Sequence, residues 1–139
     1  MNWTYLLTSI DGRISRQPFW IAVLCLLVPE LIAHFAIGER WSSIVSLLLA
    51  YPSFAVLAKR GHDRNVPTWV PGIFIAGSVV VDLLVLLDLI GPLTKPSTLF
   101  YVIGVPVGIM AIILLIDFGF RRGTVGENRY GPDPLAGTS

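Results

Sequence analysis

Apolar residues along the chain gather into four long stretches, at residues 19–37, 41–58, 69–90 and 99–120. Short polar segments separate them, at residues 38–40, 59–68 and 91–98. A helix that crosses a bilayer needs about 17 to 25 predominantly apolar residues, and each stretch has that length. The pattern therefore predicts an all-α integral membrane protein, a four-helix bundle.

The second stretch is the least apolar of the four. It carries Ser42, Ser43, Ser46 and Pro52, and a re-entrant segment is the alternative interpretation. The distribution of basic residues fits an even number of crossings better. We therefore expect this stretch to cross the membrane.

Composition supports the same class of protein. Hydrophobic residues make up 54% of the 139 residues and charged residues 14%, with a mean hydropathy of +0.73. Soluble domains have about 25% charged residues, and disordered chains combine low hydrophobicity with high net charge. The net charge of +1 gives no electrostatic footprint for nucleic acid. The length fits a single membrane domain over residues 1–139.

Basic residues predict the orientation, because short cytoplasmic segments carry an excess of Lys and Arg. Only Arg40 and Lys95 fall in the segments at 38–40 and 91–98. The other eight of the ten basic residues are Arg13, Arg16, Lys59, Arg60, Arg64, Arg121, Arg122 and Arg129. Both termini are therefore expected in the cytoplasm, with residues 121–139 as a cytoplasmic tail.

The N-terminal segment, residues 1–16, has apolar positions at helical spacing. Polar residues lie between them, and Gly12 interrupts the pattern. Such a segment is typical of a short helix in the membrane interface. The apolar positions are Trp3, Leu6, Leu7, Ile10 and Ile14.

Three segments of the predicted cytoplasmic face carry a resemblance. They are residues 12–20 (with Gly12, Arg13 and Phe19), residues 59–63, and the tail at residues 123–134. In these segments the chain resembles the bacterial inner-membrane family called domain of unknown function 805. The resemblance implies a small helical protein of the bacterial plasma membrane and implies no activity.

The predicted cytoplasmic face also holds the candidate binding residues. Clustered guanidinium groups suit phosphate, because each is planar and binds two oxygens at once. The alternative is structural: these residues cap helix ends and pair internally, Arg60 with Asp63 and Asp117 with Arg121, while the tail packs on the central loop. The candidate residues for an anion, a lipid headgroup or a protein partner are Arg13, Arg16, Arg60, His62, Asp63, Arg64, Asn128, Arg129 and Tyr130.

Three ionisable residues lie within the predicted spans, where charge is costly and often functional. His34 follows Glu30 by four positions and shares its helix face, and Asp82 has a similar depth in the third span. These residues predict a proton or cation site. The alternative is a structural network of neutral carboxyl groups with hydrogen bonds.

Catalytic signals are weak. His62 and Asp63 are adjacent, as in some metal hydrolases, but His34 is the only other histidine and Cys25 the only cysteine. A structural zinc site needs four such ligands, and no nucleotide-binding or nucleophile motif occurs. We expect no enzyme activity, no metal and no cofactor.

Gly104 and Gly108 form a small-residue pair in the fourth span, which favours close helix packing. Packing within the monomer is the favoured interpretation, and a homo-oligomer contact is the other. As a function, the sequence favours a non-enzymatic module whose cytoplasmic face binds a protein partner or anionic lipid. The alternative is a small transporter or channel component that uses Glu30, His34 and Asp82.

Overall fold

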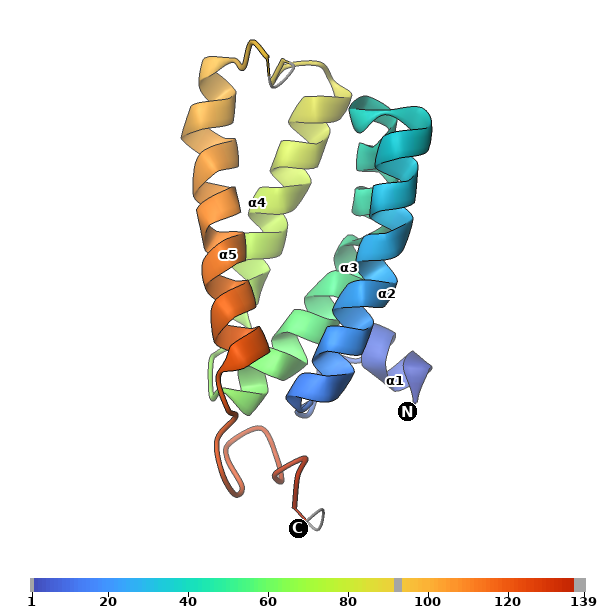
Figure 1. Ribbon diagram of the computed structural model, residues 1–139. Helices are drawn as coiled ribbons and strands as arrows, with labels where there is room; N and C mark the ends of the chain where they lie inside the picture. Colours follow the sequence, from blue (N-terminus) through green and yellow to red (C-terminus); the bar gives the residue numbers. More distant parts are fainter. Residues whose placement is uncertain (1, 92–93, 137–139) are drawn as a thin grey trace.

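A computed structural model describes residues 2–91 and 94–136. All regular elements in these two ranges are helical, and one isolated antiparallel bridge joins Asn128 and Gly131 in the C-terminal segment. The predicted all-α class is confirmed. Figure 1 shows the long helices side by side, and α3 packs closely against both α2 and α4.

Within the described residues, four helices are long and apolar enough to cross a membrane, as the sequence predicted. The second is one continuous helix, which excludes the re-entrant alternative. The fourth begins with a π-helical turn, η1. The elements are α1 (Trp3–Thr8), α2 (Arg16–Ile37), α3 (Glu39–Asp63), α4 (Trp69–Leu86), η1 (Phe100–Gly104) and α5 (Val105–Phe120).

Two of the helix ends differ from the predicted bounds of the spans. α3 continues to Asp63 instead of ending at residue 58, because the polar side chains of its last turns are buried against protein. α4 ends at Leu86 instead of residue 90. Asp88 has a φ of 61°, a left-handed conformation that a right-handed helix does not contain.

The π-helical turn has a local cause in the sequence. Pro106 has no backbone N–H, so it cannot donate to the carbonyl of Val102 one turn earlier. A π-helical turn absorbs such a break in the hydrogen-bond ladder. η1 therefore connects directly to α5, and together they form the fourth span, Phe100–Phe120.

The helices converge at one end of the bundle, here called the basal end. α2 and α4 begin there, α3 and α5 end there, and both α1 and the C-terminal segment lie there (Figure 1). Asn2 caps the start of α1: its Oδ1 accepts a hydrogen bond from the Tyr5 N–H at 3.1 Å, a typical N-cap.

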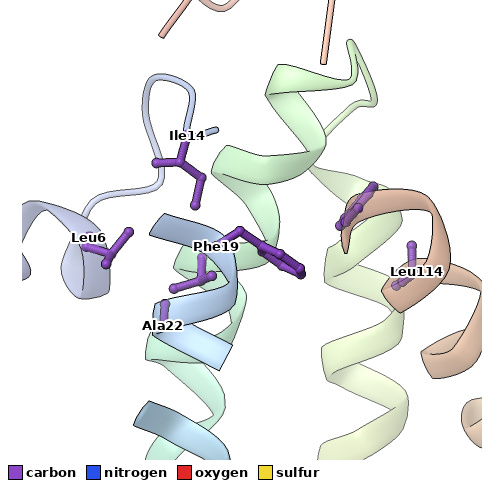
Figure 2. Packing of buried hydrophobic residues seen from close by; sticks show 7 residues of the cluster. Leu6, Ile14, Phe19, Ala22 and Leu114 are labelled. Carbon is purple, nitrogen blue, oxygen red and sulfur yellow. The ribbon is translucent and has the colours of Figure 1, made fainter. Parts of the chain in front are cut away.

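The N-terminal segment packs on the bundle. Leu6 and Ile14 are buried in one apolar cluster with Phe19 and Ala22 of α2 and with Leu114 of α5 (Figure 2). The predicted short helix is present at Trp3–Thr8, and three of the predicted apolar positions of the N-terminal segment, Leu6, Leu7 and Ile14, pack on the bundle. This cluster anchors α1 next to the polar residues of the basal end.

Close helix packing occurs at a glycine other than the predicted pair. The nearest atoms to a Cβ placed on Gly104 belong to Phe100 of the preceding turn. Apart from the adjacent residues and the nearby backbone of the same helix, no atom of the described residues lies within 4 Å of a Cβ placed on Gly108. The expected packing of this pair within the monomer is therefore wrong. A Cβ on Gly77 of α4 would lie 2.8 Å from Cγ2 of Val107 on α5, so α4 and α5 meet there.

Alanine substitutions at Gly77 and Gly108 should therefore have opposite effects. We expect Gly77→Ala to lower the free energy of unfolding by about 1 to 3 kcal/mol through overpacking. Gly108→Ala should raise it by up to about 1 kcal/mol, because alanine favours helix more than glycine. Unfolding of both variants in detergent micelles measures the difference. A destabilised Gly108→Ala variant would instead indicate a contact between copies.

Candidate functional site

Asp63, the last residue of α3, lies at the centre of the basal end, and its side chain is 4% exposed. Its Oδ1 accepts hydrogen bonds from Arg13 Nε at 3.1 Å and Nη2 at 2.9 Å. Its Oδ2 forms an ion pair with Arg60. One carboxylate therefore pairs with two buried guanidinium groups, and we call Arg13, Arg60 and Asp63 the Asp63 cluster.

Two further donors of Arg60 bind the end of α5. Nε donates to the carbonyl of Phe118 at 2.6 Å, and Nη2 donates to that of Arg121 at 2.7 Å. The last carbonyls of a helix lack partners within it and carry partial negative charge. Arg60 thus caps α5 and binds the end of α3 to it.

Arg13 binds the C-terminal segment in the same way. Its Nη1 donates to the carbonyl of Gly126 at 2.7 Å, and its Nη2 donates to that of Thr124 at 2.6 Å. The Thr124 N–H donates to the Asp63 carbonyl at 2.7 Å. Gly123 lies so close that an added Cβ would overlap the Asp63 carboxylate. The segment after α5 is therefore part of the buried network.

Lys59, one turn before Asp63, holds the N-terminal helix. Its Nζ donates to the carbonyls of Tyr5 and Leu6, both at 2.7 Å, and also to that of Ser9. These carbonyls lie at the end of α1, where a positive charge is favourable. Lys59 is completely buried, so the ammonium group has exchanged water for three protein acceptors.

His62 connects the N-terminal segment, the loop after α3 and the tail. Its Nδ1 lies 3.0 Å from the Gly12 carbonyl, which only accepts, so Nδ1 carries the proton. Its ring stacks on Tyr130 with centroids 3.8 Å apart, and Asn128 donates to its carbonyl at 2.9 Å. The predicted packing of the tail on the central loop is confirmed.

Ion pairs at the edge of the basal end are more exposed. Asp117 pairs with Arg64 at 3.2 Å and with Arg121 at 3.0 Å. Arg129 donates to the Asn65 carbonyl at 3.0 Å. The pairs predicted by helical spacing, Arg60 with Asp63 and Asp117 with Arg121, are both present.

Asp133 fixes the end of the described tail. Its carboxylate accepts from the backbone N–H groups of Gly126 and Leu135, both at 2.9 Å. These hydrogen bonds hold the pKa of Asp133 below its usual value, because they favour the charged form. At neutral pH Asp133 therefore stays ionised beside the arginines of the basal end.

Three exposed arginines lie where α2 begins and α5 ends. Arg16 opens α2, and Arg121 and Arg122 directly follow α5. Arg16 and Arg122 line one small recess, and Arg16 Nη1 donates to the Phe120 carbonyl at 3.3 Å. These guanidinium groups face solvent, in contrast to those of Arg13 and Arg60.

A cavity of about 410 Å³ lies between the four long helices. It is lined by Glu30 of α2 and Asp82 of α4, so the structure brings two of the three predicted intramembrane residues together. His34 is exposed and packs edge-on against Phe35, and it is not among the residues that line the cavity. The carboxyl groups, without the histidine, form this polar site.

The residues predicted for anion or partner binding all lie at the basal end, but most of their polar groups are engaged with protein. The sequence did not single out Lys59, Arg121 or Arg122 as binding residues. Arg121 and Arg122 are exposed, whereas Arg13 and Arg60 are buried. This difference depends on contacts between residues that are distant in the sequence. In the part of the chain that the structure describes, no group of three His, Cys, Asp or Glu residues could hold a metal.

The four apolar helices and the polar network that closes one end define the class: a small helical membrane protein. The sequence matches the family described as protein of unknown function (DUF805) over residues 7–132. The chain belongs to this family, which confirms the resemblance seen in the sequence. Uncharacterized protein YiiR of Escherichia coli strain K12 is 30% identical over 135 residues, 91% of this chain and 86% of the relative.

The protein with the same name from Escherichia coli O157:H7 has the same identity and coverage. No solved structure gives a significant match.

Proposed function

We propose that this protein is a non-enzymatic module of the bacterial plasma membrane that binds the phosphate of an anionic lipid headgroup at its basal end. Arg16, Arg121 and Arg122 are the binding residues. The observation that carries the proposal is the position of these three exposed guanidinium groups at the ends of two membrane-crossing helices, α2 and α5. A lipid phosphate lies at that depth in a bilayer.

The neighbouring aromatic residues support this location. Trp20 donates from Nε1 to the Gly119 carbonyl at 3.1 Å, and its ring meets Phe120 edge-on with centroids 5.5 Å apart. Phe120 is exposed. Aromatic rings next to arginine are typical of the boundary between hydrocarbon and headgroups, so this pair would lie just below the lipid phosphates.

Charge supports the choice of residues. Arg13 and Arg60 are buried and donate to protein acceptors, so their groups are not free for a ligand. The Arg121 side chain is 68% exposed, and its pair with Asp117 contributes little because surface ion pairs are weak. Asp133 shares the recess of Arg16 and Arg122, and its carboxylate already accepts two backbone hydrogen bonds.

The proposal includes an orientation with the basal end and both termini in the cytoplasm. Eight basic residues lie at or next to this end, whereas Arg40, in the first turn of α3, and Lys95, in the connection after α4, lie at the opposite end. Such asymmetry favours a cytoplasmic basal end. The anionic lipids of the inner leaflet would then face the exposed arginines.

The triple variant Arg16→Gln, Arg121→Gln, Arg122→Gln tests the proposal. The probe is phosphatidylglycerol, titrated against purified protein in detergent and quantified by native mass spectrometry. Because a basic residue near an anionic surface contributes about 1 kcal/mol, we expect affinity to fall about fivefold per arginine removed. Phosphatidylcholine, which has no net charge, should bind weakly to both proteins.

The matched control is the double variant Arg40→Gln, Lys95→Gln, which removes basic residues at the opposite end. It should bind phosphatidylglycerol like the wild type. Unchanged phosphatidylglycerol affinity in the folded triple variant would overturn the lipid proposal. In that case a protein partner becomes the better candidate for the basal end.

A further inference from the structure

We propose that the cavity between the long helices binds a lipophilic organic cation, a ligand with a compact apolar body and one protonated amine. The ammonium group would lie beside Glu30 and Asp82, and the apolar body would fill the rest of the cavity. This site is separate from the basal end. The inference stands whether or not the basal end binds lipid.

Helical spacing explains why one polar site forms here. Glu30 lies seven residues after Val23 on α2, and Asp82 lies four after Ser78 on α4, so each pair shares a helix face. Glu30 is 14 residues into α2 and Asp82 is 13 residues into α4, which places both about 20 Å from the basal end. The two carboxyl groups therefore have the same depth in the bundle.

Small residues on α3 leave the space that forms the cavity. Ser46, Ala50 and Ser53 line the cavity from one face of this helix, and none of them reaches far into the space between helices. The volume of about 410 Å³ falls within the range of about 300 to 1,000 Å³ that is usual for small-molecule sites. A compact organic molecule therefore has space here.

The chemistry of the lining selects the ligand. Besides the two carboxyl groups, the polar lining residues are the serines at positions 46, 53 and 78, and all the others are apolar. In the described ranges, neither Glu30 nor Asp82 has an ion-pair or hydrogen-bond partner. A carboxylate away from water is stable only when a cation or hydrogen bonds compensate it, and an ammonium group provides both.

An inorganic divalent cation fits the lining less well. Ca²⁺ takes six to eight oxygen ligands and Mg²⁺ needs an octahedral set. The Ser78 hydroxyl already donates to the Phe74 carbonyl at 3.0 Å, and the long apolar side chains supply no oxygen. An amine with an apolar body matches both the carboxyl groups and the apolar side chains of the lining.

Access is available from the surface of the bundle. Leu27 lines the cavity and is also 41% exposed, so the cavity reaches the outer face of α2. Lipophilic amines dissolve in the bilayer and would approach from that side. The carboxyl groups would then retain the charged form of the amine.

The test compares two ligands of the same shape, 1-adamantylamine and 1-adamantanol. Their binding to the full-length protein in lipid nanodiscs is measured by isothermal titration calorimetry at neutral pH. We expect the amine to bind at least tenfold more tightly than the alcohol. Glu30→Gln and Asp82→Asn should each remove most of that difference and leave alcohol binding unchanged.

Two further variants complete the test. Glu39→Gln, the same chemical change at the start of α3, should bind both ligands like the wild type. Ala50→Leu should weaken both ligands, because the larger side chain fills the cavity. The wild-type comparison needs no variant, so it remains decisive if a carboxyl variant fails to fold.

Three results would overturn the proposal. Equal affinity for amine and alcohol would show an apolar cavity that does not select a cation. Wild-type amine affinity in both carboxyl variants would place the amine elsewhere. Absence of binding by either ligand to folded wild-type protein would leave the carboxyl groups as structural residues.

Discussion

Asp63→Ala is expected to lower the free energy of unfolding by about 3 to 5 kcal/mol, the range found when one partner of a buried ion pair is removed. The substitution leaves the guanidinium groups of Arg13 and Arg60 buried without a counterion. Their remaining carbonyl acceptors cannot balance two full positive charges. Unfolding in detergent micelles, followed by circular dichroism, measures the loss.

The matched control is Asp11→Ala. Asp11 is exposed, so its removal should change the free energy of unfolding by less than about 0.5 kcal/mol. The conservative variant Asp63→Asn keeps the shape but removes the charge, and it should also be strongly destabilised. An Asp63→Ala variant as stable as the wild type would contradict the central role of this carboxylate.

Lys59→Met is expected to detach α1 from the bundle while α2 to α5 stay folded. Methionine keeps the apolar length of the side chain but removes the donor to the carbonyls of Tyr5, Leu6 and Ser9. Hydrogen bonds to a charged group contribute about 1.5 to 3 kcal/mol each. We therefore expect local opening of residues 3–8 to become at least a hundredfold more frequent.

Hydrogen exchange gives a direct measurement of this opening. The Leu6 amide, which donates to the Asn2 carbonyl at 2.9 Å, should lose its protection in Lys59→Met, whereas amides in the middle of α4 should not change. Lys95→Met, at an exposed lysine in the opposite connection, is the control. Equal protection of Leu6 in all three proteins would show that Lys59 does not hold α1.

The sequence predicted the parts of the fold that depend on local properties. Length and apolarity alone identify each span, because a bilayer requires both. The end of α3 was placed too early because Lys59, Arg60 and His62 resemble a polar loop. They remain helical because the N-terminal segment, α5 and the tail bury them, and these contacts join residues 50 to 66 positions apart.

For the candidate sites too, the sequence predicted what depends on local spacing and missed what depends on contacts between distant residues. Helical spacing gave the ion pairs of Arg60 with Asp63 and Asp117 with Arg121 directly. The positions of Glu30 and Asp82 along their spans predicted a similar depth in the membrane for both, and the structure adds the cavity that both residues line. His34 lies one turn nearer the end of α2, beyond the lining of that cavity. Which arginines are buried depends on tail contacts that the sequence does not reveal.

The contacts of Arg13 also affect the order in which the protein can be completed during synthesis. Arg13 leaves the ribosome early, but its acceptors at Thr124 and Gly126 lie 111 and 113 residues later. Until residues 124–126 are translated, the Arg13 guanidinium lacks these carbonyl acceptors. The contacts that join Arg13 to the C-terminal segment therefore form only after α5 has been made.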